Sequence, residues 1–121
     1  MEIKGYEQLI VWQKAMDLTV EVYNLTKLLP KEERYALSDQ MRRAAVSIPS
    51  NIAEGQSRGS TKEFIQFLHF AAASNAELFT QLLICERVKY FSAEQLKNVK
   101  DLSSQVSRMI STLLSKLITI K

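Results

Sequence analysis

The sequence predicts an all-α protein, an antiparallel up-down-up-down four-helix bundle whose second helix is kinked by a proline. Two observations lead to this fold class. Apolar residues recur at alternating spacings of three and four in four separate segments, as the buried stripe of a bundle helix requires. Only three glycines and two prolines occur in 121 residues, which indicates long helices with short connections. We expect one domain over residues 1–121, long enough to bury a core.

The first helix is expected from about Tyr6 to Leu29, where Pro30 ends it. Trp12 and Tyr23 flank its apolar stripe and widen it, so Trp12 is assigned to the core or to an interface rather than to ligand stacking. Pro30 and the acidic residues after it suit the first turn of the next helix. The stripe itself consists of Val11, Ala15, Leu18, Val22, Leu25 and Leu29.

The second helix carries two stripes and a proline. Pro49 has no N–H for the carbonyl of Ala45, and an interior helix proline costs about 3 kcal/mol. One interpretation ends a helix near Ser47 and begins another after Ser50 or Asn51; the other keeps one kinked helix. We favour the kink because both stripes keep their phase across the proline, and we expect Gly55 to end the helix. The apolar stripe is Leu37, Met41, Ala45, Ile48 and Ile52; the polar stripe is Gln40, Arg43, Ser47, Asn51, Glu54 and Arg58.

The third helix is expected to begin at a capping box formed by Ser60 and Glu63, and to end near Lys89. The two glycines before it do not form a nucleotide loop, because no strand precedes them and no Gly-Lys-Ser/Thr follows. The small residues at 71–76 would let a neighbouring helix approach closely at Ala44 and Ala45. The same helix carries Cys85, which we assign to the core, and His69, which we assign to a structural or surface role.

The fourth helix is expected after a second capping box, which Ser92 and Gln95 form. Its apolar seam is Val99, Leu102, Val106, Met109, Leu113, Leu117 and Ile120.

Several segments resemble one known family. QMRRAAVSIPSNIAEG (residues 40–55) resembles the signature of four-helix-bundle proteins first noted as products of intervening sequences in bacterial 23S ribosomal RNA genes. The further matching segments are YEQLIVWQKAMDL, ERYALSDQ, SRGSTKEFIQFL and AAASNAEL. The resemblance implies a four-helix bundle that assembles with copies of itself into a ring of five. A fainter similarity to accessory proteins of diversity-generating retroelements, which bind RNA, implies RNA as a partner.

Composition and pattern exclude several function classes. The inward positions are aliphatic, no Glu-x-x-His occurs and no nucleophile has a recognisable base, so we expect no enzyme, cofactor, metal or small-molecule substrate. No signal pattern or apolar run of about 20 residues appears, so no membrane contact is expected. Cys85 is the only cysteine, which suits a reducing cytoplasm. The net charge is +3, and residues 91–121 carry that whole excess.

Two functional hypotheses remain open. The first is a nucleic-acid-binding oligomer whose phosphate contacts come from Arg42, Arg43, Arg58 and Lys62, besides the basic last helix. The second is a structural or protein-interaction scaffold in which Arg43 pairs with Glu54 of a neighbouring copy. A third interpretation places these groups in caps and solvated salt bridges within one chain. The interface expected for an assembly consists of Trp12, Gln40, Arg43, Ser47, Asn51 and Glu54.

Overall fold

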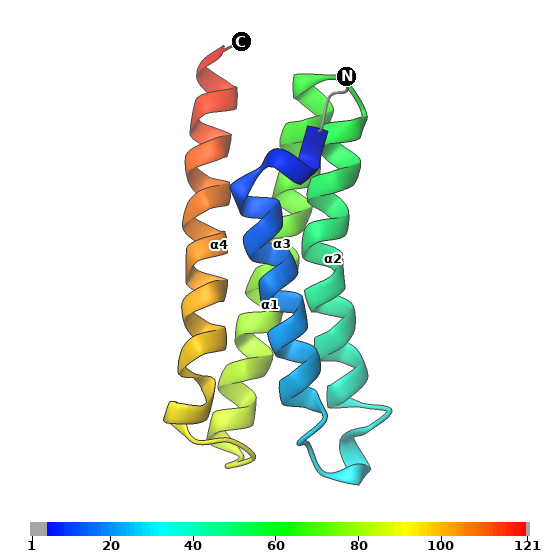
Figure 1. The fold of residues 1–121 in the computed structure, drawn as a ribbon, viewed down its shortest axis with the longest axis vertical. Helices are drawn as coiled ribbons and strands as arrows, with labels where there is room; N and C mark the ends of the chain where they lie inside the picture. The colour runs from blue at the N-terminus through cyan, green and yellow to red at the C-terminus, as the bar shows by residue number, and fades with distance from the viewer. Residues whose placement is uncertain (1–4, 121) are drawn as a thin grey trace.

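The computed structural model describes residues 5–120 and contains four long helices and no strand in that range. The helices are α1 (Ile10–Thr26), α2 (Leu37–Ser57), α3 (Thr61–Arg87) and α4 (Ala93–Ile120), with short 3₁₀ helices η1 (Gly5–Gln8) and η2 (Lys31–Glu33). Figure 1 shows consecutive helices running in opposite directions. Each helix packs against two others, in the cyclic order α1, α2, α3, α4. The prediction of an all-helical, four-helix protein is confirmed.

The core is aliphatic and follows the predicted stripes in the first two helices. Val11, Ala15, Leu18 and Val22 of α1 are buried. So are the stripe residues Met41, Ala45, Ile48 and Ile52 of α2, while Leu37 is half-buried at the start of that helix.

The predicted seam of α4 is wrong in part. Val99 and Val106 are buried, but the other buried positions of this helix are Leu96, Ser103 and Ile110. The inward face is rotated because Ser103, a polar residue that hydropathy places outside, points into the bundle and pairs with α3. The seam residues Leu102, Met109, Leu113 and Leu117 are only half-buried, and the side chain of Ile120 lies outside the described residues.

The first helix is shorter than predicted at both ends. It begins at Ile10 because Leu9 is extended (φ −77°, ψ 126°), which lets Tyr6 fold back onto Trp12 at 5.3 Å between ring centroids. It ends at Thr26 rather than Leu29 because the last turn tightens into i to i−3 hydrogen bonds, such as that from the Leu29 N–H to the Thr26 carbonyl.

The second helix is continuous from Leu37 to Ser57, and Pro49 lies buried within it. A loop at Pro49 is therefore excluded, while the bend that proline is expected to introduce stays a prediction.

The prediction that Gly55 ends this helix is wrong. Gly55 is helical, and the residue with a left-handed backbone is Gly59 (φ 82°) in the connection that follows. Glycine is needed at position 55 for packing instead. A Cβ atom there would lie 2.6 Å from the Cβ of Phe67 and 3.1 Å from Cδ1 of Phe64, both on α3.

The predicted capping box at Ser92 is complete, whereas the one at Ser60 forms only one of its two expected hydrogen bonds. The Ser92 hydroxyl accepts the Gln95 N–H at 3.2 Å, and the Gln95 side chain accepts the Ser92 N–H at 2.9 Å. Ser60 accepts the Glu63 N–H at 3.1 Å, but Glu63 returns to the Ser60 hydroxyl rather than to its N–H. The C-terminus of α3 closes with Lys89 at φ 67° and the Tyr90 N–H on the Cys85 carbonyl at 2.9 Å, a Schellman arrangement.

Candidate interaction surfaces

The side of the bundle formed by α1 and α2 exposes large apolar side chains. On α1, Met16 is 41% exposed and Val20 is 57% exposed; on α2, Val46 is 39% exposed. A shallow groove runs between the two helices, lined largely by carbon atoms. We call this surface the α1–α2 apolar face and define it by Trp12, Met16, Val20, Tyr23, Val46, Pro49 and Ala53.

The polar stripe of α2 lies on the other flank of that helix, beside α3. The Ser47 and Ser74 hydroxyls are hydrogen bonded at 2.8 Å. The Asn51 side chain donates to the Ser47 carbonyl at 2.8 Å and to its hydroxyl at 2.9 Å. These two members of the expected interface therefore already have partners within the chain. The Ser47–Ser74 bond joins α2 to α3 within the run of small residues at 71–76, and Ala44 and Ala45 are buried.

Arg58 is held in a network of opposite charges at the junction of α2 and α3. Its guanidinium contacts the carboxylates of Glu54 at 2.7 Å and Glu63 at 3.1 Å, and it lies over the ring of Phe67 at 4.9 Å from the centroid. The hydrogen bond that Arg58 donates to Glu54 is the main cause that raises the pKa of Arg58. Glu54, expected to meet Arg43 of another copy, is thus paired within its own helix.

The four cations expected to bind nucleic acid do not form one cluster. Arg42 and Arg58 are sixteen residues apart on one helix, which separates them by about 24 Å along its axis. Arg42 is half-buried near the α1–α2 connection, whereas Lys62 is exposed in the first turn of α3. Arg43 is exposed on α2, as is Gln40, and neither forms a side-chain hydrogen bond within residues 5–120.

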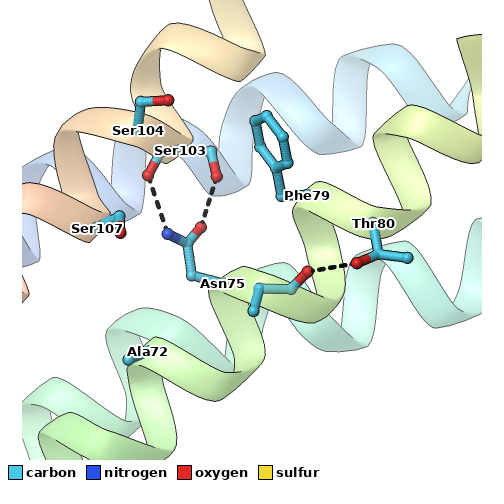
Figure 2. A pocket seen from close by; sticks show the side chains of 8 residues that line it. Ala72, Asn75, Phe79, Thr80, Ser103, Ser104 and Ser107 are labelled. Carbon is cyan, nitrogen blue, oxygen red and sulfur yellow. Dashed lines mark hydrogen bonds between the residues drawn. The ribbon is translucent and has the colours of Figure 1, made fainter.

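A buried polar pair joins α3 to α4 and was not predicted. Asn75 donates to the Ser103 carbonyl at 2.9 Å and accepts from the Ser103 hydroxyl at 2.8 Å, as Figure 2 shows. Small side chains around the pair leave a groove of about 430 Å³ between the two helices. The sequence signal was present, because Asn75 falls on the apolar face of its helix. The groove is lined by Ala72, Asn75, Ala76, Phe79, Thr80, Ser103, Ser104 and Ser107.

The titratable groups that sequence reasoning singled out lie where it placed them. Cys85 is fully buried, and this burial raises the pKa of its thiol to about 11. His69 is exposed. Within the described residues, no three or more His, Cys, Asp and Glu side chains gather where they could hold a metal. No described helix has the length and apolar character that crossing a membrane requires.

The fold and these surfaces define a four-helix-bundle protein whose candidate sites lie on exposed helix faces and at one end of the bundle. Residues 7–112 match the family model described as 23S rRNA-intervening sequence protein, and the chain belongs to this family. No curated protein matches the chain. It is similar to a crystal structure from Bacteroides thetaiotaomicron, described as a protein with unknown function from the S23 ribosomal protein family. That match has 26% identity and a TM-score of 0.81, and covers 88% of this chain and 96% of the other.

Proposed function

We propose that this chain is a non-enzymatic assembly module that forms a closed homo-oligomer through its α1–α2 apolar face. The observation that supports this proposal is the row of exposed apolar side chains on two adjacent helices. Met16 and Val46 line one groove with Trp12, and Val20 and Tyr23 are exposed on the same helix as Met16. Contiguous apolar surface of this kind is typical of protein contacts, where aromatic residues and methionine are enriched.

The interface proposed here differs from the polar seam that the sequence predicted. Trp12 remains part of it, and the exposed Gln40 and Arg43 are available for its polar rim. Ser47 instead bonds to Ser74 of α3, Asn51 bonds to Ser47 within α2, and Glu54 pairs with Arg58. An Arg43–Glu54 pair between copies would require Glu54 to leave its present partner.

The number of copies that we propose is five, by resemblance to the family. Multi-angle light scattering on the purified protein at micromolar concentration tests the assembly, and the expected mass is five times that of one chain. A monomeric mass would contradict the whole proposal, while a different closed number would contradict only the five.

RNA binding through this assembly is the second candidate function. It is supported by the family description, which refers to 23S rRNA, and by the net positive charge of the chain. The exposed Arg43 and Lys62, with the half-buried Arg42, are the contacts we propose. Arg58 is less suitable because two carboxylates already hold it.

Gel mobility shift with a structured RNA at two salt concentrations tests the second candidate. Replacing Arg42, Arg43 and Lys62 with glutamine should lower the salt slope by about one unit for each lost phosphate contact. Arg58→Gln is the matched control and should leave the slope unchanged. No RNA affinity at low salt would reduce the proposal to the scaffold function alone.

A further inference from the structure

A cationic pocket is lined by the connection between α1 and α2 and by residues of the two helices beside it. This connection is at the bottom of Figure 1. Its volume is about 290 Å³, just below the range of about 300–1,000 Å³ for small-molecule pockets, which suits a ligand as small as one phosphate group. Four of its eight lining residues are cationic and none is acidic. The lining consists of Thr26, Lys27, Leu29, Pro30, Lys31, Arg34, Ser38 and Arg42.

Arg42 is fixed at this pocket by contacts that leave part of its guanidinium unoccupied. Its Nε donates to the Thr26 hydroxyl at 2.9 Å, and its guanidinium lies over the ring of Tyr23 at 4.8 Å from the centroid. Neither Nη group has a hydrogen-bond partner within residues 5–120. Two adjacent N–H donors on a fixed, planar group match two oxygens of a phosphate.

Glu32 and Glu33, which lie between these cations in the sequence, act on another part of the molecule. The Glu33 carboxylate accepts the Leu37 N–H at 3.3 Å and the Tyr90 hydroxyl at 2.6 Å, so it faces the connection between α3 and α4. Glu32 also acts on Tyr90, whose pKa it helps to raise. No salt bridge in the described part of the chain involves any of the four pocket cations. Asp39, next to Ser38 in the first turn of α2, forms neither a salt bridge nor a side-chain hydrogen bond with them within residues 5–120.

A purely structural role for these cations would be to stabilise the C-terminus of α1. The dipole of a helix places roughly half a negative charge there. The N-terminus of α2 begins at Leu37, close to the same pocket, and supplies the opposite half charge. Four full positive charges exceed what this helix end requires, which favours an external anion.

We propose that this pocket binds a phosphate group, either a free phosphate or a phosphodiester of RNA. The inference goes beyond the assembly function and does not depend on it, because every lining residue belongs to one chain. The pocket shares Arg42 with the RNA contacts proposed above but does not depend on RNA binding, since inorganic phosphate alone should bind.

Titration of the ¹⁵N-labelled protein with inorganic phosphate at constant ionic strength tests the site. The expected result is a saturable shift of the backbone amides of Lys31, Arg34 and Ser38 and of the Arg42 Nε–H signal. The absence of such shifts at phosphate concentrations up to tens of millimolar would overturn the proposal.

A pair of double variants separates a specific pocket from a general charge effect. Lys31→Gln with Arg34→Gln removes two exposed cations of the pocket and retains Arg42, which supports the fold; phosphate affinity should fall at least ten-fold. Arg108→Gln with Lys116→Gln removes the same charge from α4, outside the pocket, and should leave the affinity unchanged. Equal weakening by both pairs would overturn the proposal.

The source of the phosphate is settled by a second titration with a short single-stranded RNA. Displacement of inorganic phosphate, with shifts of the same pocket signals, would assign the site to a nucleic-acid backbone. Binding of inorganic phosphate that RNA does not displace would support the pocket as a site for a free phosphate.

Discussion

Thr19 of α1 donates to the carbonyl of Ala45 on α2, with 3.2 Å between its hydroxyl and that oxygen. This is the carbonyl that Pro49, four residues later, cannot serve because proline has no N–H. The same hydroxyl lies 2.8 Å from the Ala15 carbonyl in its own helix, so one proton is shared between two acceptors. The Thr19 hydroxyl of α1 thus donates to α2 the hydrogen bond that Pro49 cannot donate, which accounts for the continuity of α2.

Thr19→Val should therefore destabilise the protein, by about 1 kcal/mol, because it leaves the buried Ala45 carbonyl without a donor. In a Pro49→Ala background the same substitution should cost less, since the new N–H of residue 49 serves that carbonyl. Urea unfolding of the four proteins in this cycle measures the difference. Equal costs in the two backgrounds would contradict the proposed role of Thr19.

Asn75→Ala should destabilise the protein by about 1–3 kcal/mol, because the buried Ser103 hydroxyl loses its acceptor. Combined with Ser103→Ala, the total loss should be smaller than the sum of the two single losses. The control is Ser104→Ala, at the neighbouring half-buried position, which should change stability by less than about 0.5 kcal/mol. If Asn75→Ala costs no more than this control, the pair does not stabilise the contact between α3 and α4.

The sequence predicted the helices better than their ends and surfaces. Hydrophobic periodicity and capping motifs depend only on residues close together in the sequence. The apolar stripe of α2 and the Ser92–Gln95 capping box were therefore recognisable without a structure. The role of Gly55 was not, because it depends on Phe67, which only tertiary packing brings near. For the same reason the stripe of α2 did not show that Asn51 bonds within the chain while Val46 remains exposed. Three of the pocket cations lie in the connection between α1 and α2, and the fold of that connection places Arg42 of α2 beside them.

Gly55→Ala should destabilise the protein although alanine is the better helix former by about 1 kcal/mol. The added methyl would lie 2.6 Å from the Phe67 Cβ, and a crowded core typically loses about 1–3 kcal/mol. The control is Ser57→Ala, at an exposed position of the same helix. Thermal unfolding of both variants measures the effect, and a Gly55→Ala protein as stable as the parent would show that α2 and α3 can separate without cost.

Cys85 should be protected from thiol reagents in the folded protein, because burial raises the pKa of its thiol to about 11 and excludes the reagent. The raised pKa also implies a loss of stability in alkali. The contribution of the neutral Cys85 thiol to the free energy of unfolding is present in full below the ordinary thiol pKa of 9.0. It is lost as the pH rises toward 11, because only the unfolded chain ionises its thiol between these pH values. In a Cys85→Ala variant the free energy of unfolding should depend less on pH between these two values. Rapid labelling at neutral pH without unfolding would contradict the buried position.

Sedimentation velocity of two matched variants tests the assembly through the α1–α2 apolar face most directly. Val20 is 57% exposed on that face and Ile118 is 55% exposed on α4, so a lysine at either position should leave the fold of one chain intact. Val20→Lys should shift the protein from the oligomer to the monomer, because it places a charge in the proposed contact, while Ile118→Lys should sediment like the parent. A Val20→Lys protein that retains the parent's oligomeric state would contradict assembly through this face.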